Sequence, residues 1–429
     1  MAIAGDPGVS DSINYYVEKA KADLLTHLNL LGDKGWTPEG FDYLRYELCT
    51  GVLPFVMAYQ GITGVRLAEE APVVQWFAPF MAMQTVVNDK VLTPDYGVGG
   101  IHWNVNRWRS GDLAMSLGVV PDKYKPAVFR LFDQAFGLNG DQTFDIYKPG
   151  DAVFALINYP FDQSEYQKGV DLPNFWADEK AGYFILRDKW ESGDGFVTTI
   201  TTNQLARPGS HSHKEAGSFR IIGFGEVCAC WGTKTPGVRN ENLENTVKMV
   251  EATNWRGAEV IEKEHQVGSG MSMLISMDIT NYYLGGSKFQ DSIYLGVNSA
   301  IRSFYVKYPE TGGANYVIYD KISGGNEKTW EMFTSVEDVS AYENGFEIRS
   351  KSGSVMYGKI FIPAKVKVNY DPEIKKVFFP VDFESLVTLE IFESDSSNLY
   401  LFDESKSDEE NIMELRRILK LGSVDSSIK

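Results

Sequence analysis

The chain has 429 residues, of which 43% are hydrophobic and 13% aromatic, so it is long enough for two or three domains and too apolar to be disordered. Its formal net charge of −17 argues against a general binder of nucleic acid or of anionic membranes, and its longest apolar runs fall short of the roughly 18 residues of a membrane-spanning helix. Three cysteines are too few for a disulfide scaffold, and the opening MAIAGDPGVS lacks the basic start and apolar core of a signal peptide, which predicts a chain without an export signal.

Apolar residues recur every three or four positions in the first part of the chain, which predicts amphipathic helices. The pattern covers residues 11–31, 39–60, 66–92 and 121–137. Long loops rich in glycine and tryptophan separate these segments. Residues 1–160 are therefore expected to form a helical domain.

One of these loops contains the segment HWNVNRWR, residues 102–109. Its aromatic, amide and guanidinium groups suit a carbohydrate that carries carboxylates, because rings stack on sugars and arginine pairs with a carboxylate through two hydrogen bonds. The candidate glycan-binding residues are His102, Trp103, Asn104, Arg107 and Arg109, together with Arg45 of the preceding helical segment. A structural loop fits the same sequence equally well.

Beyond residue 160 the sequence changes to short β-branched and aromatic runs bounded by glycine, asparagine or aspartate. Eight or more such runs predict a large antiparallel β-sandwich over residues 176–395, with one helical pattern around residues 241–251. The predicted fold class is therefore α+β with several domains.

Residues 396–429 are predicted to form an acidic tail with an amphipathic helix. Residues 381–414 hold eleven Asp or Glu and one Lys. Ser407 followed by Glu410 has the spacing of a capping box, and a stripe of isoleucine and leucine residues follows. We expect this helix to dock on its own protein or on a partner.

Two of the five histidines, His211 and His213, stand two positions apart. On a strand, side chains at this spacing point the same way, so both imidazoles would face one space. They could ligate a metal, place a base beside a ligand, or be two hydrogen-bonded sheet histidines.

Cys230 lies 17 residues after His213, and Glu244 lies 14 residues further on. Imidazole, thiolate and carboxylate are all competent zinc ligands. The alternative is that Cys230 is a small buried apolar residue and Glu244 a carboxylate on a helix surface. Two interpretations are also open for Tyr43 and Tyr46, which lie on one face of the predicted helix. They either project into a cleft or pack against the protein with a solvated hydroxyl.

Several ordered segments resemble the heparinase II/III-like polysaccharide lyases, including alginate lyases and uronyl epimerases of similar architecture. GWTPEGFDYLRYELCTGVLPFVMAY, residues 35–59, is similar to that family's helical stretch with two tyrosines and a Leu-Pro-Phe run. GYFILRDKW resembles the strand that opens its sandwich, and GSHSHKEAGSF resembles its His-x-His segment. CACWG and LENTV stand where the family usually has an aspartate and a second histidine.

The resemblance implies an incomplete α/α toroid that leads into an antiparallel β-sandwich, with a cleft for an acidic polysaccharide between them. The implied reaction is β-elimination at a uronic acid, in which a base removes the C5 proton and an acid protonates the departing oxygen. Carried over, Tyr43 or Tyr46 is the catalytic tyrosine, and His211 lines the same cleft. The implied ligands of a structural Zn²⁺ are His213, Cys230 and Glu244, and no organic cofactor is implied.

Three departures from the family pattern keep other interpretations open. Cys230 and Glu244 replace the usual zinc ligands, family members are usually exported, and the toroid normally has further helices upstream. Those helices would come from a separate polypeptide, or the loop around residues 100–110 would supply the missing groups. One alternative is a non-catalytic glycan-binding or assembly subunit that reuses this fold. Another is a metal-dependent hydrolase centred on His211, His213, Cys230 and Glu244.

Overall fold

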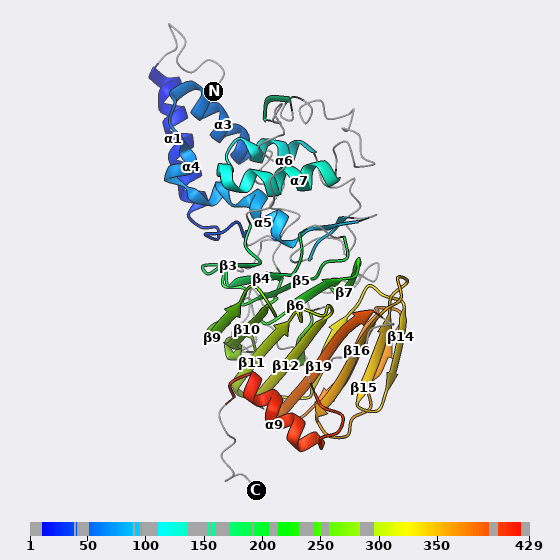
Figure 1. Ribbon diagram of the computed structural model, residues 1–429. Coiled ribbons are helices and arrows are strands. Elements are labelled where there is room, and N and C mark those ends of the chain that lie inside the picture. The colour runs from blue at the N-terminus through cyan, green and yellow to red at the C-terminus, as the bar shows by residue number, and fades with distance from the viewer. Residues whose placement is uncertain are drawn as a thin grey trace.

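The computed structural model places a layer of helices over a five-stranded sheet, with an eight-stranded sheet beneath it and one further helix, α9 (Asp408–Ile418), on the outer face of the larger sheet (Figure 1). The predicted α+β class is confirmed, because helices come first and large antiparallel sheets follow. The residues that the structure describes are 11–37, 40, 51–88, 91–94, 96, 110–135, 153, 156–158, 172–190, 193–205, 213–230, 244–249, 257–283, 296–393 and 402–421.

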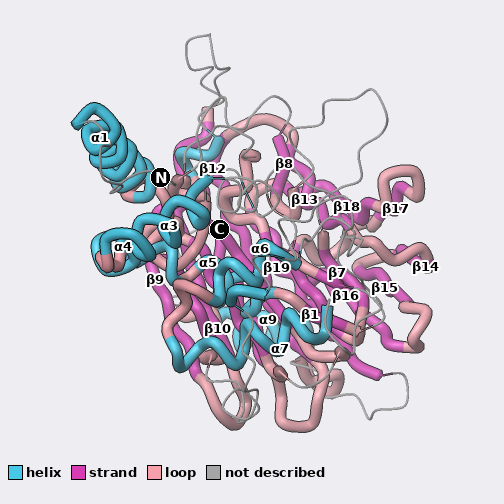
Figure 2. The backbone as a smooth tube through the Cα atoms, turned by 90° about the horizontal axis from the view of Figure 1, so that it is seen from above, coloured by secondary structure: helices cyan, strands magenta, loops and turns pink. Residues whose placement is uncertain are grey.

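The helical layer consists of short elements. They are α1 (Asp11–Leu28), α3 (Leu53–Thr63), α4 (Leu67–Glu70), η2 (Pro72–Gln75), α5 (Phe77–Gln84), α6 (Ser110–Leu117), η4 (Asp122–Tyr124) and α7 (Lys125–Ala135), with a hairpin of β1 (Val86–Val87) and β2 (Val91–Leu92) after α5. Seen from above, α1, α3 and α4 lie toward one side, while α5, α6 and α7 overlie the sheets (Figure 2). None of the helices in the described ranges is long and apolar enough to cross a bilayer.

The helical pattern predicted over residues 66–92 is confirmed by α4, η2 and α5, but it is wrong beyond Gln84, where the β1–β2 hairpin follows. Ala71 ends α4 with φ −130° and ψ 79°, because the ring of the following Pro72 disfavours helical geometry in the residue before it. The chain resumes as a 3₁₀ turn and then as α5. At Thr85 it becomes extended and enters the β1–β2 hairpin.

Three larger antiparallel sheets follow. The five-stranded sheet has the order β3 (Phe175–Asp178), β4 (Tyr183–Arg187), β5 (Val197–Thr201), β6 (Phe219–Gly223), β7 (Glu226–Ala229). The eight-stranded sheet has the order β14 (Asp338–Tyr342), β15 (Gly345–Arg349), β16 (Ser354–Ile362), β19 (Glu384–Glu393), β12 (Ala314–Gly324), β11 (Val297–Lys307), β10 (Ser272–Asp278), β9 (Glu259–Gln266). The four-stranded sheet has the order β17 (Asn369–Asp371), β18 (Lys376–Val381), β13 (Lys328–Phe333), β8 (Val247–Met249).

The helix predicted around residues 241–251 is also wrong, because its described part contains strand β8. The side chain of Asn245 donates to the carbonyl of Phe219 at 2.7 Å and accepts from the N–H of Phe333 at 2.8 Å. These contacts with two other strands hold the segment extended, and Val247 and Met249 point into the core. Tertiary packing therefore overrides a helical periodicity here.

The five-stranded sheet is buried on both faces. In β4, Tyr183 and Ile185 belong to the apolar core shared with the helices, whereas Phe184 and Leu186 belong to the core shared with the other sheets. A strand places successive side chains on opposite faces, so this short apolar run serves two cores at once.

Polar contacts fix the helical layer onto this sheet. The buried carboxylate of Asp178 accepts the backbone N–H groups of Asp33 at 3.1 Å, Lys34 at 2.9 Å and Trp36 at 3.0 Å. From β4, Nη1 of Arg187 donates to the carbonyls that end α5, including that of Thr85 at 2.6 Å. The loop after α1 and the end of α5 are thereby tied to β3 and β4.

Helix α9 confirms the helix predicted in the tail. Ser407 and Glu410 form the expected capping box. Leu415 and Leu419 are buried against the outer face of the eight-stranded sheet, and Arg416 forms an ion pair with Glu384 of β19 at 2.7 Å. The helix therefore docks on its own protein.

Candidate functional site

Three titratable side chains meet beside strand β6. His213 and Glu215 lie on the segment that leads into β6, and Glu244 lies on the segment that leads into β8. Their exposed fractions are 7%, 1% and 1%. One nitrogen or oxygen from each of the three lies within 4.8 Å of the others. Two segments far apart in the sequence thus form one compact group, which we call the His213 cluster.

The geometry of the His213 cluster suits a metal ion. Nδ1 of His213 lies 3.7 Å from Oε1 of Glu215 and 3.8 Å from Oε1 of Glu244. The ligand atoms of a tetrahedral ion with bonds of about 2.1 Å stand about 3.4 Å apart, close to the two distances from His213. The Glu215 and Glu244 ligand atoms lie within 4.8 Å of each other. Oε1 of Glu244 is buried and accepts no hydrogen bond from the described residues. One imidazole and two carboxylates at this spacing fit a divalent cation such as Zn²⁺.

The other oxygen of Glu244 holds a buried arginine. Nη2 of Arg220 lies 2.6 Å from Oε2 of Glu244, and the hydroxyl of Ser218 donates to the same oxygen at 2.8 Å. Nη1 of Arg220 donates to Ser218 Oγ at 2.6 Å. Burial lowers the pKa of Arg220, but the charges of Glu244 and of neighbouring groups, together with the hydrogen bond to Glu244, outweigh it, so the net pKa lies above the ordinary value. Arg220 is therefore a permanent cation inside the protein.

Tyr96 packs on the arginine that pairs with the cluster. The guanidinium of Arg220 lies 4.2 Å from the centre of the Tyr96 ring, a cation–π contact. The Tyr96 hydroxyl donates to the carbonyls of Thr199 and Ser218, each at 3.3 Å. Burial raises the pKa of Tyr96 well above its usual range, so this phenol stays protonated. It packs as a neutral residue.

The structure brings together two of the predicted metal ligands, His213 and Glu244. Cys230 is not among the three residues of the cluster. It directly follows β7, its N–H donates to the carbonyl of Phe333 at 2.9 Å, and its side chain belongs to the core shared with the helices. Glu244 is buried and does not lie on a helix surface.

The remaining predicted site residues lie outside the part of the chain that the structure describes. They are the candidate catalytic residues Tyr43, Tyr46 and His211, and the candidate glycan-binding residues Arg45, His102, Trp103, Asn104, Arg107 and Arg109.

Two members of the site were missed from the sequence. Glu215 stands two positions after His213, the same spacing that singled out His211, so alternation could have found it. Arg220 interrupts the apolar run FRIIG of β6. A charge inside a buried strand signals a buried partner, but it does not say which carboxylate that partner is.

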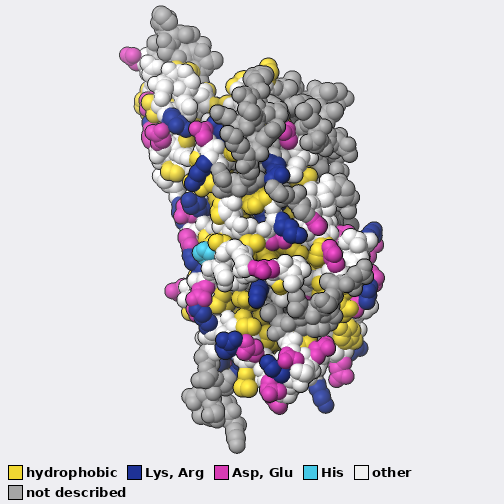
Figure 3. Space-filling view, in the orientation of Figure 1, with side chains coloured by type: hydrophobic (Ala, Val, Ile, Leu, Met, Phe, Trp, Pro, Cys, Tyr) yellow, Lys and Arg dark blue, Asp and Glu magenta, His cyan; other side chains and the backbone are white. Residues whose placement is uncertain are grey.

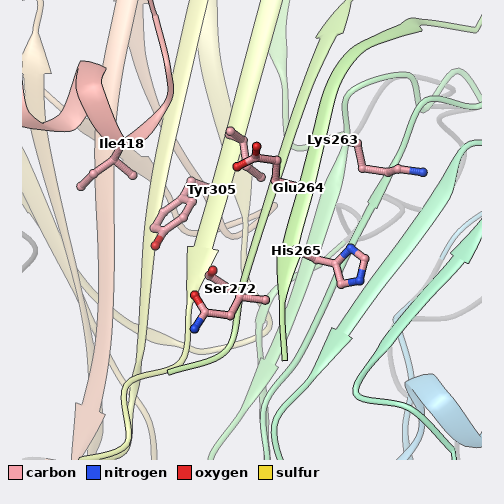
Figure 4. A pocket seen from close by; sticks show the side chains of 8 residues that line it. Lys263, Glu264, His265, Ser272, Tyr305 and Ile418 are labelled. Atoms are coloured by element: carbon pink, nitrogen blue, oxygen red, sulfur yellow. The ribbon is translucent and has the colours of Figure 1, made fainter. Parts of the chain in front are cut away.

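A surface pocket of about 470 Å³ lies elsewhere, between the edge of the eight-stranded sheet and α9. In Figure 4, Glu264, Tyr305 and Ile418 point to one side of strands β9 to β11, while Lys263 and His265 extend to the other. Its charged groups already have partners, since Glu264 pairs with Lys420 and Lys263 pairs with Glu179. On the face shown in Figure 3, acidic and basic side chains are interspersed over the sheets and α9.

Comparison of the sequence with protein-family models and with curated proteins finds no match. The fold is similar to solved structures described as heparinase III (TM-score 0.58, 12% identity, 88% of this chain and 57% of that chain) and as heparan sulfate lyase HepC from Pedobacter heparinus (TM-score 0.55, 12% identity, 94% and 60%). A heparinase III described as the BT4657 gene product gives a TM-score of 0.50 at 14% identity, over 89% and 58%. This chain thus spans about three fifths of the length of the structures that it matches, and with them it shares a polysaccharide lyase-like fold.

Proposed function

We propose that this chain is a polysaccharide lyase that cleaves a uronate-containing acidic glycan by β-elimination. The observation that carries the proposal is the fold similarity to the structure described as heparinase III, which extends over 88% of this chain. The ordered tyrosine and histidine segments support it independently. In this proposal the helices belong to an α/α toroid and the sheets form a β-sandwich.

The proposed chemistry assigns the proton transfers to Tyr43 or Tyr46 and to His211. The proton on C5 of a uronate becomes acidic when the neighbouring carboxylate is neutralised, and a phenol or imidazole near it then serves as base or acid. A tyrosine acts as a base when cationic neighbours stabilise its phenolate. Arg45 stands between the two tyrosines in sequence. The loop residues His102, Trp103, Asn104, Arg107 and Arg109 would bind the sugar and its carboxylate.

We also propose that the His213 cluster binds a structural Zn²⁺. His213, Glu215 and Glu244 would be its ligands among the described residues, with Glu215 in the place first given to Cys230. The ion would fasten the segment before β6 to the segment before β8, because it joins residues that are remote in sequence. His211 lies two residues before His213, so this anchoring would also steady a proposed catalytic histidine.

Activity on defined glycans tests the lyase proposal. The protein is incubated separately with heparan sulfate, other glycosaminoglycans, alginate and glucuronan, while the absorbance of the unsaturated product is followed. Replacing the responsible tyrosine, by Tyr43→Phe or Tyr46→Phe, should lower kcat by roughly 10² to 10⁴-fold. Tyr59→Phe is a matched control, since its hydroxyl donates to Glu18 and takes no part in the proposed chemistry.

Lack of product on every glycan, from folded protein, would contradict the lyase proposal. The non-catalytic alternative then predicts that a glycan still binds and that the Tyr43→Phe/Tyr46→Phe double variant binds it equally well. An epimerase would be recognised by uptake of solvent deuterium at C5 without chain cleavage.

A further inference from the structure

Arg302 is a fully buried arginine that reaches from the eight-stranded sheet to both segments of the His213 cluster. It lies on β11 with an exposed fraction of 0%. Its Nη1 donates to the carbonyl of Gly217 at 2.7 Å and to the carbonyl of Asn245 at 2.8 Å. Gly217 follows Glu215 by two residues, and Asn245 directly follows Glu244. A single nitrogen therefore bridges the two backbone segments that carry the three candidate ligands.

The other edge of the Arg302 guanidinium is fixed to its own sheet. Nε lies 2.6 Å from Oδ1 of Asp320 and Nη2 lies 3.0 Å from Oδ2, a bidentate pair with the residue opposite on β12. The hydroxyl of Ser385 on β19 donates to the same carboxylate at 3.1 Å. A planar guanidinium held in this way on one edge presents its remaining N–H groups in a fixed direction.

Hydrogen bonds from Ser218 to Glu244 and from the Asn245 side chain to Phe219 also join the two segments, while three neighbouring side chains hold one segment each. Tyr282 donates to the carbonyl of Lys214 at 3.1 Å, and Tyr283 donates to the carbonyl of Val247 at 2.6 Å. The side chain of Asn203 donates to the carbonyl of His213 at 2.9 Å. The contacts of Tyr282, Tyr283 and Asn203 each serve one segment, whereas Nη1 of Arg302 contacts both segments from the eight-stranded sheet.

Gly217 shows that this contact is closely packed. Its φ of +79° is unfavourable for any residue with a side chain. A Cβ at this position would also lie 3.3 Å from Cδ of Arg302. An alanine here would strain the backbone and push on the arginine from the side of the cluster.

We propose that Arg302 is a positioning residue for the metal site: anchored on Asp320, it sets the separation between the segment carrying His213 and Glu215 and the segment carrying Glu244. This inference rests on the zinc part of the proposed function. Groups that orient metal ligands without touching the ion change metal affinity by about 10–100-fold when they are removed. Arg302 reaches both ligand-bearing segments from β11, which belongs to a different sheet from β6.

The test removes the bridge without leaving a buried charge. Arg302→Met alone would strand the carboxylate of Asp320, so Arg302→Met is combined with Asp320→Leu, because replacing a whole buried pair by apolar residues is often neutral for stability. Zinc affinity of the purified protein is measured by competition with a chromophoric chelator, and folding by near-UV circular dichroism. We expect zinc binding about 10–100-fold weaker in the folded double variant. Gly217→Ala, which disturbs the same contact from the other side, should also weaken it.

Arg187→Met is the matched control. Arg187 is likewise a buried arginine that donates to carbonyls, but its partners are the carbonyls that end α5 and that of Lys189. The Arg187→Met substitution should lower the free energy of unfolding and leave the zinc affinity unchanged. Equal zinc affinity in the wild type and in either folded bridge variant would overturn the positioning role. A wild type that binds no zinc would overturn the metal site and this inference together, while lyase activity is measured separately on the glycans.

Discussion

The Glu244 carboxylate compensates the charge of Arg220 in a place that water does not reach. Glu244→Ala would remove the carboxylate that pairs with this buried guanidinium. Removing one member of a buried ion pair typically costs about 3–5 kcal/mol. We expect a loss of this size in the free energy of unfolding, measured by denaturant titration. Glu310→Ala, at an exposed glutamate, should change the same quantity by less than about 0.5 kcal/mol.

A pH dependence is expected from Asp178. Burial and a hydrogen bond with the Asp33 side chain raise the pKa of Asp178 to about 6, although the N–H groups of Trp36, Lys34 and Ala181 act in the opposite direction. The folded state therefore binds more protons than the unfolded state between about pH 4 and pH 6. The contribution of protonated Asp178 to the free energy of unfolding should therefore fall as the pH rises from about 4 to about 6, and it should not change further above that range.

The check compares the free energy of unfolding of the wild type and of Asp178→Asn from pH 4 to pH 7. The asparagine cannot ionise, so its curve should lack the descending part that Asp178 adds to the wild type. Parallel curves for the two proteins would contradict the assignment of this proton to Asp178.

At the scale of elements, α9 offers two neighbouring positions with opposite environments. Leu415 is fully buried against the eight-stranded sheet, whereas 65% of Met413 is exposed. Leu415→Ala should cost about 2–5 kcal/mol, and the helix should exchange its amide hydrogens faster. Met413→Ala should alter neither stability nor exchange measurably. Similar effects of the two changes would mean that α9 does not pack as described.

Local patterns were sufficient for some elements and insufficient for others. The capping box at Ser407 and Glu410 predicted the start of α9, because both partners lie within one helical turn. The strand at Val247 was predicted as a helix because the contacts that extend it come from β6 and β13. Similarly, an apolar run such as that of β4 cannot reveal from sequence that its two faces enter different cores.

The candidate site was predictable in part for the same reason. Alternation singled out His213, and the family resemblance pointed to Glu244. The resemblance named Cys230, whereas the structure assembles the cluster with Glu215. The bridge from Arg302 to Gly217 and Asn245 joins residues separated by 85 and 57 positions. No local pattern can pair groups at such distances, so only the tertiary structure shows this part of the site.

At the scale of the whole molecule, the arrangement predicts that helices and sheets unfold together. The five-stranded sheet contributes to the core on both of its sides, so separating the helices would expose apolar side chains of β4, β5 and β6. Circular dichroism at a helical and at a strand wavelength should give the same thermal midpoint. Two well-separated midpoints would contradict this expectation.

The double burial of the five-stranded sheet also limits how this protein can vary. A substitution in β4 to β6 affects the core on only one face of the sheet. A one-residue shift of register, in contrast, would move every side chain of a strand from one core to the other. Insertions should therefore be tolerated in the connecting loops and not in these strands. The lengths of these middle strands are therefore strictly fixed, and one of them, β6, carries the arginine that pairs with the His213 cluster.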